Sequence, residues 1–230
     1  MYYYDSYYIL LMLLVGVAFL VQSLVNSRFQ KYSETAILSD MTGKQVAEKI
    51  LHDAGIFDVS VQPSGRSGLS DHYDPMHRML RLSADVINST SISAVSVAAH
   101  EAAHALQHAQ NYKPLVIRTA CVNTVNFGSR FFMLMIVLGI LLSFSPLLYV
   151  GIALYSMVVF FSLVTLPVEF NASRRALSIM TDSGILRADE LHGAKSVLSA
   201  AAMTYVVSAL SAVVQLLRLV SMANRAKRRD

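Results

Sequence analysis

The chain has 230 residues, of which 54% are hydrophobic and only 15% are charged, and its mean hydropathy is +0.48. This composition excludes an ordinary soluble domain and indicates a membrane protein. The net charge of +4 is modest, so we interpret the basic residues as signals of membrane topology: the lipid bilayer is an expected partner and nucleic acid is not. The single cysteine, Cys121, excludes an internal disulfide and a thiolate zinc site, so any metal must be held by His and carboxylate.

The first element is an apolar, uncharged segment over residues 7–25, which is close to the length that spans a bilayer. The tyrosines of the preceding MYYYDS suit the membrane interface. The alternative is a cleavable signal peptide, which would carry a positive flank before the segment and a small-residue cleavage site after it, whereas NSRFQKYS follows. We therefore expect an uncleaved anchor over residues 1–27.

Residues 28–126 have the composition of a small polar α+β domain. A short helix is predicted from Thr42 as N-cap, with Gln45 three residues on, to Gly55 as the stop. The stretches FDVSVQPSG and HRMLRLS alternate as strands do and flank the turn-rich SGRSGLSDHYDP. We expect the strands near Val59–Gln62 and Met79–Leu82 to offer an edge to an extended peptide. The segment SISAVSVAAHEAAHALQHAQ then returns to helix.

The second half is nearly all apolar. Residues 131–168 carry no charge and are interrupted by SFSP, which predicts a transmembrane hairpin over 127–168. A further helix and linker follow over 169–195, and a last hydrophobic segment with a basic tail occupies 196–230. The predicted fold is therefore mainly α: a multi-pass membrane protein with about four hydrophobic helices and a small α+β domain.

The motif HExxH, at His100, Glu101 and His104, carries the chemistry. Two imidazoles four residues apart on a helix can reach one Zn2+, and the carboxylate between them lies beside the water that the metal activates. Such a carboxylate can accept a proton and later deliver it to the leaving amine. The alternative is a helix whose His and Glu are simply solvated, but small apolar residues surround the cluster, and burying unpaired charge is costly.

A catalytic zinc needs a third protein ligand, and Glu169 is our candidate. An acidic residue at the edge of a membrane helix is expensive unless it has a role, and the two crossings between His104 and Glu169 return the chain to the side it left. His108 lies about 12 Å along the helix from His100, too far to join the same ion without a bend.

The segments DHYDP, VAAHEAAHALQHAQNYKPL and LPVEFNASRRAL resemble the bacterial YugP-like membrane neutral zinc metallopeptidases, over roughly residues 5–220. The resemblance implies that the α+β domain, which carries the HExxH helix, is zincin-like, with a gluzincin-type site distantly similar to those of HtpX and the CAAX prenyl endopeptidases. In it His100, His104 and Glu169 are zinc ligands and Glu101 is the general base. Those relatives usually carry an Asp four residues after the Glu, where this chain has Ser173, so support for a zinc histidine would come from Asn171, Ser173 or elsewhere.

Two further groups of residues are candidates for roles at the predicted site. His72 or Tyr73 could stabilise the oxyanion over the metal, whereas the alternative is a turn in which Asp71 or Asp74 caps backbone amides. Arg174 or Arg175 could pair with Glu169 or with a substrate carbonyl, or could simply mark the cytoplasmic face of the membrane.

These observations predict a membrane-embedded zinc metallopeptidase acting on a peptide or protein substrate, which could itself be a membrane protein. The alternative is a catalytically inactive zinc-binding scaffold or regulatory protein, and Glu101 separates the two because a structural zinc needs no such carboxylate. A transporter is disfavoured because the apolar segments lack charges. Of the 19 Lys and Arg, all but the five from Arg218 onward lie on the active-site side, so we expect that side to face the cytoplasm.

Overall fold

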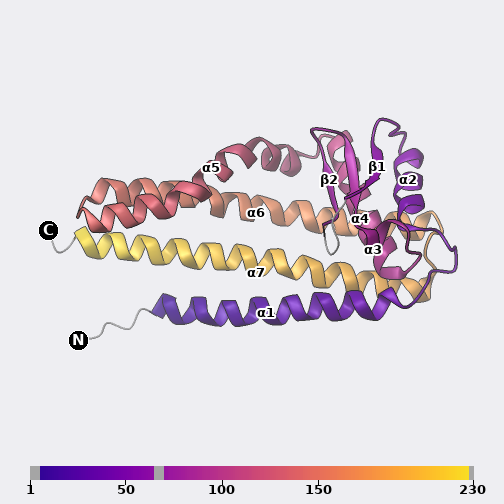
Figure 1. Cartoon of the computed structure of the whole chain (residues 1–230), viewed down its shortest axis with the longest axis horizontal. Helices are drawn as coiled ribbons and strands as arrows, with labels where there is room; N and C mark the ends of the chain where they lie inside the picture. The colour runs from indigo at the N-terminus through magenta and orange to yellow at the C-terminus, as the bar shows by residue number, and fades with distance from the viewer. Residues whose placement is uncertain (1–5, 65–69, 228–230) are drawn as a thin grey trace. The chain divides into compact units, whose positions relative to one another are not determined.

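The computed structural model describes residues 6–64 and 70–227, which form seven helices and three strands (Figure 1). In chain order these are α1 (Ser6–Ser33), α2 (Gly43–Asp53), β1 (Ser60–Pro63), β2 (His72–Asp74), β3 (Met79–Leu82), α3 (Ala84–Ile87), α4 (Ile92–Ala109), α5 (Lys113–Leu141), α6 (Ser145–Asp182) and α7 (Ala188–Lys227).

The described residues divide into two compact units. The mixed unit comprises Val21–Leu115 and Val168–Met203 and holds the whole sheet with α2, α3 and α4. The helical unit comprises residues up to Leu20, Val116–Pro167 and the residues from Thr204 onward. The boundary inside α6 falls at Pro167, which lacks the amide hydrogen of an ordinary helical residue.

The sheet of the mixed unit has the strand order β1-β3-β2, parallel between β1 and β3 and antiparallel between β3 and β2. The prediction that Met79–Leu82 offers a free edge is wrong, because β3 is paired on both sides. The free edges among the described strands belong to β1 and β2. Strand β2 lies within the stretch that the sequence indicates as a turn. Its three residues are too few and too polar to show the alternation by which a strand is predicted.

Helix α2 begins as its sequence predicts. The Thr42 hydroxyl accepts from the Gln45 amide at 3.3 Å, and the Gln45 side chain accepts from the Thr42 amide at 2.8 Å, so the capping box is complete. The helix buries Val46, Ile50 and Leu51 against α4. This packing fixes one side of the helix that carries the HExxH motif.

The core of the mixed unit also includes the part of α6 that follows Pro167. Ala172, Ala176 and Met180 recur every four residues, are fully buried, and belong to the same apolar cluster as Ala98, Ala102 and other small residues of α4. Alanine on both helices lets the two backbones approach closely. This close packing is what allows side chains of α4 and α6 to meet.

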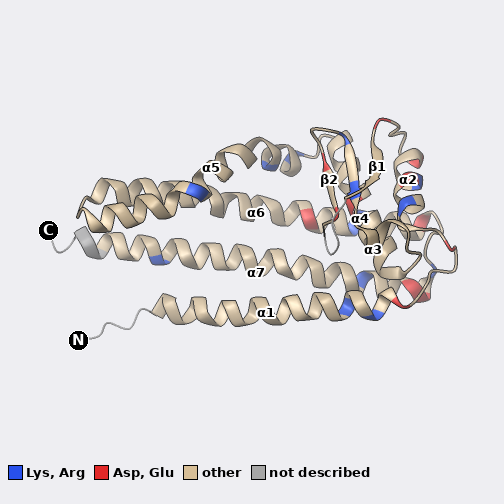
Figure 2. Cartoon of the chain, viewed as in Figure 1, with Lys and Arg blue, Asp and Glu red and all other residues tan. Residues whose placement is uncertain are grey.

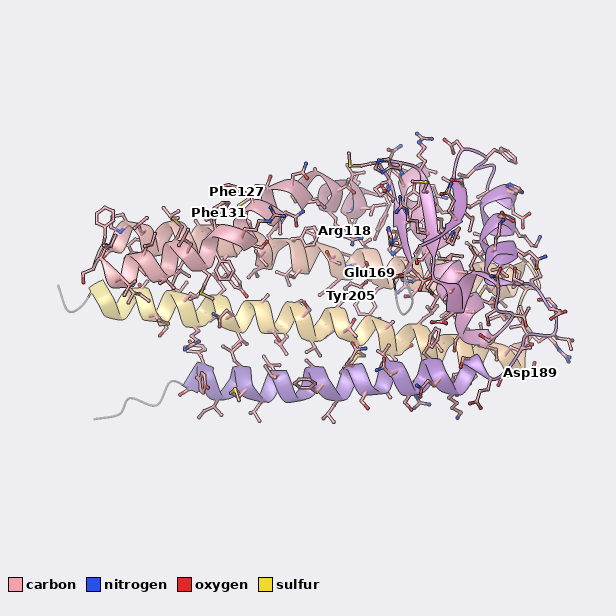
Figure 3. The ribbon with its side chains drawn as sticks, viewed as in Figure 1. Arg118, Phe127, Phe131, Glu169, Asp189 and Tyr205 are labelled. Atoms are coloured by element: carbon pink, nitrogen blue, oxygen red, sulfur yellow. The ribbon has the colours of Figure 1, made fainter. Side chains whose placement is uncertain are left out.

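The helical unit contains parts of four helices that are long and apolar enough to cross a membrane: α1, α5, α6 and α7. In the most apolar window of each, at most 44% of the residues are buried, and large side chains such as Phe127 and Phe131 on α5 are exposed (Figure 3). Charged residues are sparse along these lengths (Figure 2). Such surfaces need an apolar solvent, as lipid provides.

The expectation of a mainly helical fold with four hydrophobic helices and a small sheet is confirmed. The hairpin turn falls at residues 142–144 and overlaps the predicted SFSP interruption at residues 143–146. Helix α5 starts at Lys113 and α6 continues to Asp182, so both helices run without a break through the proposed domain boundaries at 126 and 168. The assignment of the polar domain to a zincin-like fold stays a prediction.

Substituting Gly43 tests the packing that holds α4. A Cβ added at Gly43 would overlap the backbone carbonyl of Val86 and press on Ala98 of α4. We expect Gly43→Ala to lower the free energy of unfolding by about 1–3 kcal/mol, as overpacking does, measured by thermal and denaturant unfolding in detergent. Lys44→Ala, at the next and exposed position, is the control, and equal stability of the two variants would contradict the expectation.

Candidate metal centre

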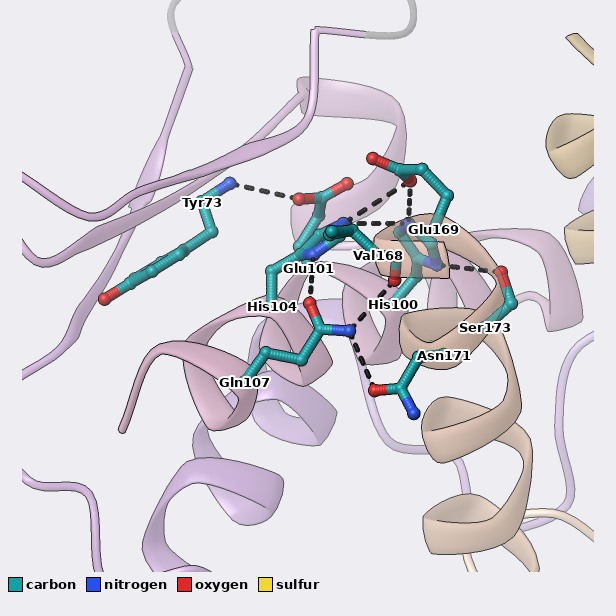
Figure 4. Close-up of polar contacts among 9 residues, drawn as sticks. All are labelled: Tyr73, His100, Glu101, His104, Gln107, Val168, Glu169, Asn171 and Ser173. Carbon is teal, nitrogen blue, oxygen red and sulfur yellow. Dashed lines mark hydrogen bonds and ion pairs between the residues drawn. The ribbon is translucent and has the colours of Figure 1, made fainter. Parts of the chain in front are cut away.

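The candidate site lies within the mixed unit, where α4 and α6 face each other (Figure 4). Helix α4 is started by Ser91, whose hydroxyl accepts from the Ala94 amide at 3.2 Å, and its alanines favour helix. One turn of α4 then presents His100 and His104 on the same face. Glu169 comes from α6 (Figure 3).

Three ligand-type atoms converge here. The Nε2 atoms of His100 and His104 lie 3.2 Å apart, and Oε2 of Glu169 lies 3.2 Å from the first and 3.5 Å from the second. Donor atoms of a tetrahedral zinc, at about 2.0–2.1 Å from the ion, are about 3.3 Å apart. The three separations therefore fit three corners of a zinc site, and the donor set of two imidazoles and a carboxylate suits that ion.

Both histidines use Nδ1 to contact neighbouring side chains. Nδ1 of His104 lies 3.0 Å from Oε1 of Gln107, and Nδ1 of His100 lies 3.2 Å from the Ser173 hydroxyl. Both contacts leave Nε2 turned toward Glu169. Ser173, one of the supports considered from the sequence, thus lies beside His100.

The cluster is largely buried. Glu169 is 2% exposed and His104 is 7% exposed. Burial opposes protonation of His104, but its hydrogen bond with Glu169 and the charges of Glu101 and Glu169 favour the imidazolium and raise the pKa above its ordinary value of 6.5. The cluster thus favours a positive charge, which either a proton or a metal cation can supply.

Glu101, the motif's carboxylate, lies outside the three-atom cluster. Its Oε2 accepts a hydrogen bond from the backbone amide of Tyr73 on β2 at 3.0 Å (Figure 4). The carboxylate is therefore held between the sheet and α4, close enough to His104 to favour its protonated form.

Tyr73 and His72 were candidates for oxyanion stabilisation. The Tyr73 hydroxyl lies 2.8 Å from Nδ1 of His108 and points away from the metal cluster in Figure 4. His72 is exposed, and its Nδ1 donates to the Ser70 carbonyl at 2.9 Å. The described contacts place neither side chain on the cluster, so the oxyanion role of both stays a prediction.

The aspartates of this stretch cap backbone amides, which was the alternative considered. Asp71 accepts from the Ser83 amide at 2.6 Å, and burial is the main cause that raises the pKa of Asp71. Asp74 accepts from the amides of Met76 and His77 at 3.0 and 3.2 Å. These bonds fix both ends of β2, and with them the position of the Tyr73 amide.

Arg175 does not pair with Glu169. Its guanidinium donates to the Gln110 side chain and lies over the Tyr112 ring, 5.8 Å from the ring centroid. Arg174 is exposed on α6.

Gln107 is the residue that the sequence reasoning missed. It is completely buried and contacts His104, Val168 and Asn171. Its spacing of three residues from His104 on a helix was the signal that could have found it, since residues three apart share a face.

Comparisons with known proteins agree with this geometry. A family model described as "Putative neutral zinc metallopeptidase" matches residues 7–224. The "Putative membrane protease YugP" of Bacillus subtilis (strain 168) is 48% identical over 206 residues, which cover 90% of this chain and 91% of that protein. No solved structure matches the chain significantly. The chain therefore belongs to the neutral zinc metallopeptidase family, as a membrane protein with four membrane-length helices.

Proposed function

We propose that this protein is a zinc-dependent endopeptidase that hydrolyses peptide bonds with Glu101 as general base. The observation that carries the proposal is the juxtaposition of three ligand-type atoms, 3.2–3.5 Å apart, with the HExxH carboxylate on the helix that carries the two histidines. A purely structural zinc site has no need of that carboxylate.

Each residue has a distinct part in the proposed reaction. His100 and His104 would bind zinc through Nε2, and Glu169 would bind it through Oε2. When bound, zinc supplies Lewis acidity, which lowers the pKa of water to about 7 and polarises a carbonyl. The Glu101 carboxylate would accept a proton from the attacking water and later pass it to the leaving amine. The Tyr73 amide would keep that carboxylate from rotating away.

The free edge of β2 supports an extended peptide as substrate. The Tyr73 amide points to Glu101 and therefore away from β3. In an antiparallel pair the amide and carbonyl of one residue face the same side, so the Tyr73 carbonyl also faces the free edge. The Tyr73 amide is already bonded to Glu101, so the Tyr73 carbonyl is the group of this residue that a substrate amide can use. We propose that a peptide or protein substrate docks along this edge in extended form, beside the proposed base.

The proposed site is tested by zinc content and peptidase activity of detergent-purified protein. Glu101→Gln should keep its zinc and lose about 10²–10⁴-fold in cleavage of a broad peptide library, because it removes the base and not a ligand. Glu169→Ala should lose both zinc and cleavage. Glu34→Gln, at an exposed carboxylate, is the matched control and should change neither.

Other outcomes would favour different roles. If wild type binds zinc and Glu101→Gln alters nothing measurable, the site is that of a catalytically inactive zinc-binding scaffold or regulatory protein. If Glu169→Ala holds zinc normally, the third ligand is another residue.

The affinity for zinc should decrease as the pH is lowered. Zinc needs neutral imidazoles, and because the pKa of His104 is raised, protons begin to compete with zinc at a higher pH than at an ordinary histidine. Chelator competition between about pH 7.5 and 5.5 should show a loss of about tenfold per pH unit for each proton displaced. Glu101→Gln removes a negative charge that favours the imidazolium of His104, so the zinc affinity of this variant should begin to fall at a lower pH than that of wild type. An affinity that is flat over this range would contradict the ligand assignment.

We also propose that the mixed unit faces the cytoplasm, because 14 of the 19 Lys and Arg lie between Arg28 and Lys195. In a Cys121→Ser background, Lys44→Cys on α2 should resist a membrane-impermeant maleimide in intact cells and react after lysis. Leu142→Cys, in the turn between α5 and α6, should react in intact cells, because the single crossing made by α5 puts the hairpin turn on the opposite side. The reversed labelling pattern would show that the site faces outward.

A further inference from the structure

Gln107 is an unusual residue for the place it occupies. It is a polar side chain with no exposed surface, on α4, one turn beyond His104. Its amide oxygen lies 3.0 Å from Nδ1 of His104, and its amide nitrogen lies 2.9 Å from both the Val168 carbonyl and Oδ1 of Asn171 (Figure 4). Three partners therefore surround one buried amide.

The chemistry of these partners fixes every direction in the chain of hydrogen bonds. The Val168 carbonyl can only accept, so the atom of Gln107 that faces it must be the nitrogen. The oxygen of Gln107 then faces His104 and can itself only accept. Nδ1 of His104 must therefore carry the proton, which in the neutral ring leaves the lone pair on Nε2.

That lone pair points to the proposed metal position. Nε2 of His104 lies 3.2 Å from Nε2 of His100 and 3.5 Å from Oε2 of Glu169. The same amide also holds the carbonyl of Val168, the residue immediately before Glu169. One side chain thus contacts a proposed ligand on α4 and the backbone that presents a proposed ligand on α6.

We propose that Gln107 is the positioning residue of this centre: it sets the tautomer of His104 and holds Glu169 in register with the two histidines. The inference rests on the proposed metal site. A neutral amide suits both tasks, because a carboxylate could accept from Nδ1 of His104 but could not donate to Val168. A neutral amide also adds no further negative charge beside His104, where the charges of Glu101 and Glu169 already act.

The partner of His100 cannot act in the same way. The Ser173 hydroxyl, 3.2 Å from Nδ1 of His100, can donate as well as accept, so it fixes no tautomer by itself. Of the two histidine contacts, the one between Gln107 and His104 is therefore the one whose donor and acceptor are fixed. Loss of the Gln107 contact with His104 should accordingly weaken zinc binding more than loss of the Ser173 contact with His100.

The test compares Gln107→Met and Gln107→Glu with wild type. Methionine keeps the length and loses every hydrogen bond, whereas glutamate keeps the acceptor for His104. Zinc affinity is measured by chelator competition, and the visible spectrum of the Co2+-substituted protein reports ligand geometry. We expect Gln107→Met to bind zinc about 10–100-fold more weakly with an altered Co2+ spectrum, and Gln107→Glu to recover only part of the affinity, because it keeps the acceptor for His104 and loses the donor to Val168.

Two controls separate positioning from general stability. Gln62→Met makes the same change at an exposed site on β1, and Ile50→Val loosens the buried core of α2 away from the cluster. Both should leave zinc affinity and the Co2+ spectrum unchanged, although Ile50→Val should lower the melting temperature of the metal-free protein.

The outcomes are distinct. Wild-type zinc affinity in a folded Gln107→Met protein would overturn the inference, as would equal weakening by methionine and glutamate. If Gln107→Met does not fold, Gln107→Glu decides alone: weaker zinc binding with a changed Co2+ spectrum supports the inference, because glutamate cannot hold Val168, and wild-type affinity with a wild-type spectrum overturns it. Failure of the wild-type protein to bind zinc would instead refute the proposed function.

Discussion

The buried carboxylate of Glu169 is the constraint on which the rest of the mixed unit depends. At 2% exposure it has lost nearly all its water, and it is compensated by imidazole nitrogens at 3.2 and 3.5 Å. A buried charge of this kind is tolerated only with such partners or a metal cation. Helices α4 and α6 must therefore hold their register within the length of a hydrogen bond, and the surrounding core serves that need.

The small residues at this contact are the means of holding register. Ala98 and Ala102 of α4 and Ala172 and Ala176 of α6 are fully buried in one apolar cluster. Alanine has no side-chain rotamers to lose and lets helix backbones come close. The histidines of α4 and Glu169 of α6 can therefore reach one another directly. The alanine-rich composition of the HExxH segment is thus part of the site as well as of the helix.

What the sequence could predict followed from patterns that are local in the chain. The capping box of Thr42 and Gln45, the HExxH spacing and the charge-free lengths each have their cause within a few residues or one helix. Glu169 could be proposed across 65 residues because a carboxylate at the end of an apolar segment is costly without a role. Its place beside the histidines follows from tertiary packing.

The features that escaped prediction have causes elsewhere in the chain. Strand β2 is too short and polar to show alternation; it exists because it pairs with β3 and because Asp71 binds the Ser83 amide. Gln107 is a polar residue near the end of a helix, where polar residues are common, so nothing in the sequence marks it as buried. Its burial depends on Val168 and Asn171 of α6. Helices α5 and α6 extend beyond the apolar segments because hydropathy marks the membrane's thickness and not the end of a helix.

The sheet and α4 meet at Glu101, which gives the small sheet its place in the proposed chemistry. Strand β2 contributes a backbone amide to that carboxylate, and the Tyr73 hydroxyl contacts His108, two turns further along α4 from Glu101. One residue of the edge strand is thus joined to the motif helix at two points. A peptide that paired with this edge would lie against a strand whose position already determines that of the proposed base, so substrate binding and base orientation would depend on the same backbone.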